Sequence, residues 1–255
     1  SLADRSRLRR WLRYRPIRRL YPQADAIVAV SRGVADDVVA TSGVAPQRVH
    51  VVTNPVIAPG IDALAAQRPA HPWLGVAGIP AILGVGRLTR QKDFATLLRA
   101  FARVRARRDA RLIVLGEGED RGALERLAAQ LGIADALDLP GFVENPYGYM
   151  AAADLFVLSS AWEGSPNALT EALYLGCPVV ATDCRSGPRE ILDGGRVAPL
   201  VPVGDAAALA DALAAVLDDP PPRATLRAAA ADYTVARSTA RYLEVLGLAA
   251  GAARC

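Results

Sequence analysis

Several residue types that mark other protein classes are scarce in this 255-residue sequence. Its three cysteines, Cys177, Cys184 and Cys255, and its two histidines show no spacing typical of metal ligands. So sparse and odd a set of cysteines suits a reducing compartment, which predicts a cytoplasmic protein. No run of about 18 apolar residues is present, and the amino terminus does not read as a secretory signal. We therefore expect neither a membrane-spanning helix nor a disulfide scaffold.

Lysine is nearly absent, because arginine supplies 29 of the 30 basic residues and Lys92 is the remaining one. A single lysine among so many arginines either marks a site that requires a compact ammonium or stands there by chance. The first twenty residues carry a net charge of +7, whereas the whole chain carries +4, so the rest is mildly acidic. This localised basicity argues against a broad nucleic-acid-binding surface, and we expect no nucleic-acid partner.

The basic stretch Arg5–Arg19 alternates cations with the apolar residues Leu8, Trp11, Leu12 and Ile17. On a helix these apolar residues would form one stripe. The stripe either docks peripherally on an anionic membrane surface, at the inner face, or belongs to the outer helix of a domain and faces that domain's core. The sequence leaves both interpretations open.

Short β-branched runs alternate with helical periods along most of the chain, which is 52% apolar. The runs are apolar on both faces, as expected for a parallel sheet covered by helices. A doubly wound, Rossmann-like α/β sheet is therefore predicted. The predicted strands are Ala26–Val30, Val49–Val52, Ala81–Val85, Arg111–Leu115, Leu137–Leu139, Leu155–Leu158, Pro178–Ala181 and Arg196–Val201.

The chain divides at stretches rich in proline and glycine. Residues 1–53 hold too few elements for a domain and are predicted to be the remnant of an amino-terminal domain. Residues 54–78 show no strong periodicity and are predicted to be an interdomain linker. Residues 79–222 hold enough strand–helix units for one Rossmann-like domain. Residues 223–255 are predicted to be helices that pack back toward the amino-terminal part, through Leu243, Leu246 and Leu248.

In open α/β sheets, ligands bind beyond the carboxyl ends of the strands, where the strand order switches. The predicted strand Ala81–Val85 is followed by Gly86, Arg87 and Lys92, and a helix should begin near Asp93. Glycine permits close approach of a ligand, and two cations at a strand end suit a diphosphate. The alternative is a cluster of surface ion pairs. The segment is neither a Walker loop nor a dinucleotide fingerprint.

A second constellation follows the strand Leu155–Leu158. Ser165 is a good N-cap and Pro166 a good first residue of a helix. The free amides of Asn167, Ala168 and Leu169 would then form an anion site at the strand end. Two carboxylates, Glu163 and Glu171, flank that site, and hydroxyl groups of a sugar or ribose would account for them. The alternatives are that Glu163 belongs to a loop turn beside Gly164 and that Glu171 is an ordinary solvated residue of the helix.

These motifs resemble those of the retaining glycosyltransferases of the large group 1 (family 4) type. The run from Glu163 to Glu171 is similar to the family's pair of glutamates separated by seven residues. Four further segments, in the family's order, also resemble its motifs: Gly86-Arg87-Leu88 with Lys92-Asp93, Leu115-Gly116-Glu117-Gly118, Gly141-Phe142-Val143, and Ser186-Gly187-Pro188-Arg189-Glu190. The resemblance covers roughly residues 20–247.

The resemblance implies a GT-B fold, in which two Rossmann-like domains face each other and the carboxyl-terminal one binds the donor nucleotide. It implies that Arg87 and Lys92 bind the donor diphosphate, together with the backbone amides at the start of the helix. Glu171 would accept the ribose hydroxyls, Glu163 beside Gly164 would hold the transferred sugar, and Phe142 and Val143 would line the base. No metal and no cofactor would be needed.

The implied reaction moves a sugar, with retention, from a nucleotide diphosphate sugar to a glycan or lipid-linked acceptor. UDP-sugar is favoured over GDP-sugar, and cell-envelope or exopolysaccharide synthesis is the implied setting. The departure from the family is that most of its amino-terminal domain has no counterpart before Ala26. Either the chain is a truncated part of such an enzyme, or a partner chain completes the cleft. The alternative function is therefore a donor-binding subunit, inactive without an acceptor domain.

Overall fold

Six parallel strands form the main sheet of the computed structural model, which describes residues 15–248. Their order across the sheet is β5-β4-β3-β6-β7-β8. The chain therefore builds outward from β3 to one edge, returns, and builds from β6 to the other edge. The strands are β3 (Ala81–Val85), β4 (Arg111–Leu115), β5 (Leu137–Gly141), β6 (Leu155–Leu158), β7 (Val179–Thr182) and β8 (Leu200–Val201). The strand order switches between β3 and β6, where a ligand crevice is expected.

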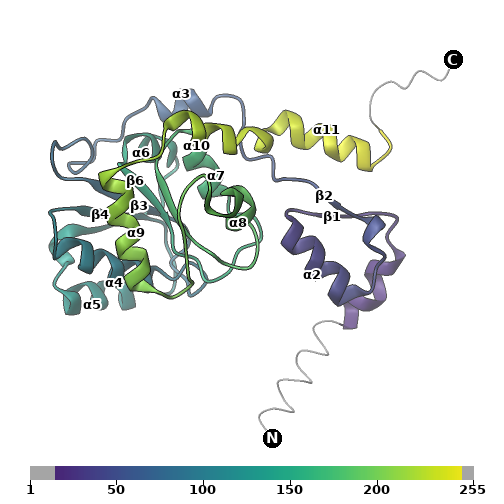
Figure 1. Ribbon diagram of the computed structural model, residues 1–255, viewed down its shortest axis with the longest axis horizontal. Helices are drawn as coiled ribbons and strands as arrows, with labels where there is room; N and C mark the ends of the chain where they lie inside the picture. The colour runs from purple at the N-terminus through teal and green to yellow at the C-terminus, as the bar shows by residue number, and fades with distance from the viewer. Residues whose placement is uncertain (1–14, 249–255) are drawn as a thin grey trace, which may run out of the picture.

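Helices cover both faces of this sheet, as Figure 1 shows. One face is covered by α4 (Phe94–Arg105), α5 (Arg121–Leu131) and α9 (Ala206–Asp218). The other is covered by α3 (Ile61–Ala65), α6 (Tyr147–Ala152), α7 (Asn167–Tyr174), α8 (Pro188–Ile191) and α10 (Arg223–Ala229). The strands are apolar on both faces because each face packs against a helical layer. The predicted doubly wound, Rossmann-like sheet is confirmed.

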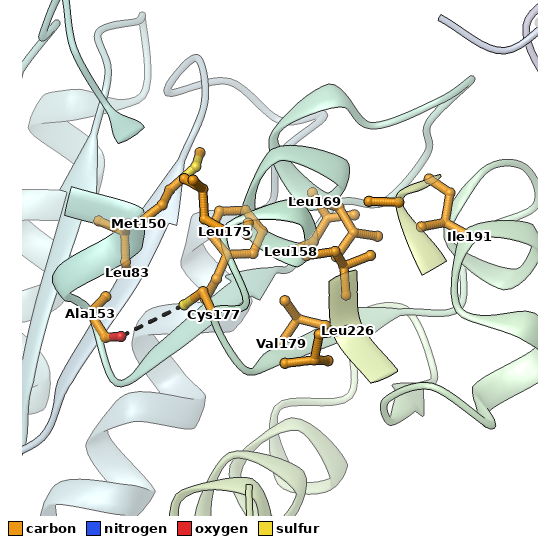
Figure 2. Close-up of a cluster of buried hydrophobic side chains, with 14 of the residues drawn as sticks. Leu83, Met150, Ala153, Leu158, Leu169, Leu175, Cys177, Val179, Ile191 and Leu226 are labelled. Atoms are coloured by element: carbon orange, nitrogen blue, oxygen red, sulfur yellow. Dashed lines mark hydrogen bonds between the residues drawn. The ribbon is translucent and has the colours of Figure 1, made fainter. Parts of the chain in front are cut away.

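Figure 2 shows part of the core on the α7 side, where aliphatic side chains of strands and helices meet. The thiol of Cys177 lies in this cluster and donates a hydrogen bond to the carbonyl oxygen of Ala153, with a sulfur–oxygen distance of 3.7 Å. Burial raises the pKa of Cys177 to about 12. Cys177 is therefore a core residue rather than a reactive one.

A small amino-terminal unit lies beside the main sheet and consists of β1 (Ile27–Ala29), α2 (Arg32–Ser42) and β2 (Val49–Val51). The two strands pair in parallel, with α2 as the crossover. The hydroxyl oxygen of Ser31 accepts a hydrogen bond from the amide of Val34 and caps the start of α2, and Gly43 ends the helix in the left-handed conformation. Nothing else extends this two-stranded sheet among residues 15–248.

Two chain segments connect this unit and the last helix, α11 (Val235–Val245), to the main body, and they run side by side. The amides of Val56 and Ile57 both donate to the carbonyl oxygen of Tyr233 at 2.9 Å, and the amide of Val235 donates to that of Ile57 at 3.1 Å. Helix α11 then continues toward β2, and both line one open cavity.

Three sequence-based expectations about this region need correction. Leu246 and Leu248, expected to pack on the amino-terminal part, are each 65% exposed, because the side of α11 that faces β2 presents Arg241, Glu244 and Val245 instead. The stretch 54–78, in which no strong periodicity was found, contains the helix α3, whose Ile61 and Ala65 are buried in the core. The strand predicted from Arg196 is confined to Leu200–Val201, because residues 196–198 form a turn and bends that follow the short 3-10 helix Asp193–Gly195.

The division into residues 1–53, 54–78, 79–222 and 223–255 stays a prediction. Residues 5–14 of the basic stretch, including Leu8, Trp11 and Leu12, lie outside the described residues. No helix within residues 15–248 is both long and apolar enough to cross a membrane.

Candidate functional site

The candidate site lies at the carboxyl ends of β3 and β6, where the strand order switches. From β3 the chain runs through Gly86 and Lys92 into α4, and from β6 it runs through Glu163 into α7. The two loops are bonded to each other. The amide of Ala161 donates to the carbonyl oxygen of Gln91 at 2.8 Å, and the Ser159 hydroxyl donates to that of Lys92 at 2.7 Å. The residues that these loops carry are therefore held in one place.

Glycines let the loops after β3 and β4 pack backbone against backbone. A Cβ at Gly116 would lie 2.0 Å from the Gly86 carbonyl oxygen, and one at Gly118 would lie 2.2 Å from that of Leu88. The amide of Leu88 donates to the carbonyl oxygen of Glu117 at 2.9 Å. A Cβ at Gly86 would meet the aliphatic stem of Lys92 at 2.9 Å. A larger residue at Gly116 or Gly118 would require the backbone to move, whereas one at Gly86 would require the Lys92 side chain to move.

Lys92 and Glu163 form a buried ion pair at the centre of the site. The Lys92 Nζ lies 2.5 Å from Glu163 Oε1, and their side chains are 18% and 7% exposed. The Ser160 hydroxyl donates to the same carboxylate oxygen at 2.8 Å. A buried carboxylate requires such partners. Both residues were predicted for the site, but their mutual contact was not, and Ser160 was not singled out.

Helix α7 points its amino end into the site. It begins at Asn167, with Pro166 in the N-cap position and no side-chain cap. The prediction of Ser165 as N-cap and Pro166 as first helical residue is therefore wrong by one position, because Pro166 has an extended backbone. The amides of Asn167, Ala168 and Leu169 are still those of the first turn, which have no partner within the helix. The Asn167 side chain accepts a hydrogen bond from Asn54 at 2.8 Å.

Glu171 lies one turn further along α7, half-buried, with the Tyr147 hydroxyl of α6 at 3.5 Å from its Oε1. Burial raises the pKa of the Glu171 carboxyl, and the hydrogen bond from Tyr147 lowers it by a smaller amount. Glu171 is therefore not the freely solvated helix residue of the alternative interpretation. One of its oxygens accepts a hydrogen bond from Tyr147, and the carboxylate keeps further lone pairs with which it can accept a hydrogen bond from a ligand hydroxyl.

A cavity of about 400 Å³ opens beside these loops, between the ends of β3, β4 and β5. Phe142 and Val143 form one wall, and Phe142 is 76% exposed. Its described lining residues are largely apolar or glycine, and the charged ones are Arg87 and Glu117. The side chain of Arg87 makes no hydrogen bond or ion pair with the other described residues, so its guanidinium is available to a ligand. An open apolar slot with a free cation at its mouth suits a nucleotide.

The segment 185–190 and α2 lie against the loop that carries Glu163. A Cβ at Gly187 would lie 2.6 Å from Pro166 Cδ, and one at Gly33 would lie 2.6 Å from Ser186 Oγ. The Glu190 carboxylate accepts hydrogen bonds from the amides of Arg32 and Gly33, at 2.7 and 3.0 Å. The loop that carries Glu163 is thus held between the main body and the amino-terminal unit.

The structure brings the predicted residues to one edge of the sheet, in two groups. Lys92, Glu163, Gly164 and the start of α7 form one group, and Gly86, Arg87, Phe142 and Val143 form the other. Their roles in ligand binding stay predictions. Ser160 was detectable from its place at a strand end, three residues before Glu163. Tyr147 and Asn54 were not, since their positions depend on how α6 and the segment after β2 pack. Within residues 15–248 no group of three or more His, Cys, Asp and Glu residues is arranged to hold a metal ion.

Residues 79–219 match the family described as "Glycosyl transferases group 1", and residues 2–58 match the one described as "Glycosyltransferase Family 4". A Campylobacter jejuni enzyme that transfers N-acetylgalactosamine to a diphospho-undecaprenol-linked sugar is 34% identical over 231 residues, which cover 88% of this chain and 61% of that protein. The lipopolysaccharide core biosynthesis glycosyltransferase LpsE of Rhizobium meliloti is 34% identical over 143 residues, or 56% of this chain and 41% of that protein.

Solved structures also match. The lipopolysaccharide outer core galactosyltransferase WaaB superposes with a TM-score of 0.72 at 24% identity, over 88% of this chain and 62% of that one. Anabaena Alr3699/HepE, in complex with UDP and glucose, does so with a TM-score of 0.76 at 22% identity, over 92% and 66%. These neighbours have the GT-B fold, which confirms the predicted fold. The chain spans between 41% and 66% of the length of the four proteins.

Proposed function

Because the chain belongs to the group 1 family of glycosyltransferases, we propose that it forms the nucleotide-sugar-binding half of a retaining enzyme that uses a UDP-sugar. The observation that carries this proposal is the convergence, at one strand-order switch, of the Lys92–Glu163 pair and the amino end of α7. Anabaena Alr3699/HepE, which shares the fold, is known in complex with UDP and UDP-glucose, and this supports the proposed donor.

The donor diphosphate would lie between the free guanidinium of Arg87 and the first-turn amides of Asn167, Ala168 and Leu169. Lys92 would contribute a second cation while keeping its contact with Glu163. Fixed donors of this kind stabilise negative charge that grows on the diphosphate as the glycosidic bond breaks, and they need no reorganisation. This chain would then supply the stabilisation of the leaving group.

The sugar and the nucleoside would lie on either side of the diphosphate. Glu163, fixed by Lys92 and Ser160, would accept hydrogen bonds from hydroxyl groups of the transferred sugar. Glu171 would accept those of the ribose, and the base would enter the cavity walled by Phe142 and Val143. With its carboxylate bound to an ammonium, Glu163 is a positioning group, and front-face attack with the leaving phosphate taking the acceptor's proton accounts for retention without a protein nucleophile.

The acceptor would be a glycan or a lipid-linked saccharide of the cell envelope. The support comes from relatives named for transfer to a diphospho-undecaprenol saccharide and for lipopolysaccharide core synthesis. A second candidate function is a donor-binding chain that is active only beside an acceptor domain. Among the described residues the amino-terminal unit has two strands of three residues each, so an acceptor domain would come from the rest of a longer protein or from a partner chain.

A calorimetric titration with UDP, UMP and GDP tests the donor site. We expect UDP to bind more tightly than UMP, by roughly the tenfold or more that charge-assisted contacts to a second phosphate contribute. Binding by none of the three would contradict the proposal. Sugar transfer that appears only on adding a candidate acceptor-domain protein would favour the second function, and transfer by this chain alone would favour the first.

A further inference from the structure

The cavity assigned to the base has one acidic side chain among its described lining residues, that of Glu117. The Glu117 carboxylate lies close to Gly141, because a Cβ at Gly141 would lie only 2.8 Å from Glu117 Oε1. Gly141 directly precedes Phe142, the wall of the cavity. The carboxylate therefore lies close to the backbone of Gly141 and is one of the groups that a base in this cavity would meet.

Arg121 occupies both oxygens of this carboxylate. Its Nη2 donates to Glu117 Oε1 at 2.7 Å and its Nε donates to Oε2 at 3.0 Å, a two-point contact. The same Nη2 also donates to the carbonyl oxygen of Leu139 in β5, at 3.0 Å. The guanidinium thus ties the loop after β4 to the strand that carries the cavity wall. The hydrogen bonds from Arg121 also lower the pKa of Glu117, so the carboxylate is ionised and paired.

The two bases that a nucleotide sugar commonly carries differ in how they would meet such a group. Guanine presents two adjacent N–H donors, and an unpaired carboxylate accepts both at once. Uracil presents one N–H between two carbonyl oxygens, which an unpaired carboxylate repels. A carboxylate that already binds a guanidinium through both oxygens has a fixed orientation and a partly neutralised charge, so it attracts guanine and repels uracil less than an unpaired carboxylate does.

We propose that Arg121 determines the base preference of the site, by holding Glu117 in a contact that weakens it as an acceptor for guanine. The inference rests on the proposed nucleotide-binding function and assigns Arg121 a role in substrate specificity. Arg121 acts through Glu117 and is a positioning residue.

The test measures dissociation constants of UDP and GDP by calorimetry for the whole chain and for four variants. Arg121→Ala should weaken UDP and strengthen GDP, so that the UDP-to-GDP preference falls by roughly 10- to 100-fold. The double variant Arg121→Ala/Glu117→Gln should lose the gain in GDP affinity, since an amide cannot accept from both guanine donors. Glu117→Gln alone should bind GDP no better than the wild type does.

Glu125→Gln is the matched control. It removes the other carboxylate that Arg121 contacts, at 3.2 Å, without touching the cavity, and it should leave the preference unchanged. Arg121→Gln, a good helix former, replaces Arg121→Ala if thermal melting shows that the alanine variant does not fold.

An unchanged UDP-to-GDP ratio in a folded Arg121 variant would overturn the inference and leave the proposed function standing. A wild type that binds GDP more tightly than UDP would overturn both the inference and the proposed UDP donor, while leaving a nucleotide-binding site in place. A wild type that binds neither nucleotide would overturn the proposed function itself.

Discussion

The backbone amide of Gly33 donates a hydrogen bond of 3.0 Å to Glu190, a residue 157 positions away in the sequence. Glu190 also accepts from the amide of Arg32, so a side chain of the main body caps the first turn of α2. The free amides at a helix start favour a negative group. The contact therefore joins the amino-terminal unit to the loops around Glu163 by charge as well as by packing.

Removing this cap should loosen α2. We expect Glu190→Ala to lower the free energy of unfolding by about 1–2 kcal/mol, the usual cost of losing a helix cap. Hydrogen exchange measured by mass spectrometry should speed up in peptides covering residues 32–38. Arg185→Ala is the control, because its ion pair with Asp37 is exposed and should contribute less than about 1 kcal/mol. Equal exchange in Glu190→Ala and wild type would refute the cap.

The backbone contact between the loops after β3 and β4 should not tolerate a side chain. Gly116→Ala would place its Cβ 2.0 Å from the Gly86 carbonyl oxygen, and Gly116 has a φ of +136°. We expect a loss of about 2–4 kcal/mol in urea unfolding, together with weaker UDP binding.

Gly122→Ala in α5 is the matched change, since beyond the helix's own backbone the nearest atom to its Cβ would be Arg126 Nη1 at 3.4 Å. It should be neutral or stabilise by up to about 1 kcal/mol, because alanine favours the helix. Similar destabilisation by both alanines would contradict the argument from the close contact.

Breaking the Lys92–Glu163 pair from one side should cost more than removing both charges. Lys92→Met leaves a buried carboxylate with Ser160 as its remaining partner, and we expect a loss of about 3–5 kcal/mol of unfolding free energy. The double variant Lys92→Met/Glu163→Gln should recover much of that loss in the same denaturant titration, while UDP-sugar binding stays impaired. If the double variant is less stable than Lys92→Met, the ion pair is not the cause.

The contribution of Glu171 to the stability of the protein should be greater in acid than at neutral pH. Its pKa in the folded protein lies above the ordinary 4.5 because burial disfavours the charged form. The stabilising contribution of the protonated form is full below the unfolded pKa and is lost as the pH rises through the folded pKa.

Glu171→Gln should therefore raise the melting temperature at pH 7 and match the wild type near pH 4. The same variant should weaken UDP binding by roughly tenfold, since ribose hydroxyls would lose a charged acceptor. Equal melting temperatures of the two proteins at pH 7 would contradict the burial argument.

The buried thiols should be inert in the native state. Burial raises the pKa of Cys177 to about 12 and that of Cys184 to about 11, so both remain protonated near pH 8, and the thiolate is the reactive form. In a Cys255→Ser variant, Ellman's reagent should release no colour at pH 8 until denaturant is added. Rapid labelling without denaturant would show that one of the two sites opens.

The strands of the main sheet could be predicted because their β-branched runs are buried on both faces, so that the run and the strand nearly coincide from Ala81 to Val85. The individual site residues could be predicted from their place at strand ends. The contact between Lys92 and Glu163 could not, because the two residues are 71 positions apart and meet only because β3 and β6 are neighbours.

Other features depend on tertiary packing alone. Leu246 and Leu248 continue an apolar pattern, yet they are exposed, since a pattern specifies a face but not the surface it meets. The pairing of Glu117 with Arg121 has the spacing of a helical ion pair, but that the pair lies beside Leu139 and Gly141 follows only from the register of β4 with β5.

The paired connections at Val56–Ile57 and Tyr233–Val235 have a mechanical consequence. A single tether lets a joined body swing and twist freely about one point. Two chain segments hydrogen-bonded along a common line resist twisting, because rotation about either one would pull it away from the other. The segment that leads to the amino-terminal unit is thereby braced against the one that leads to α11, so the unit is attached through a stiffened connection.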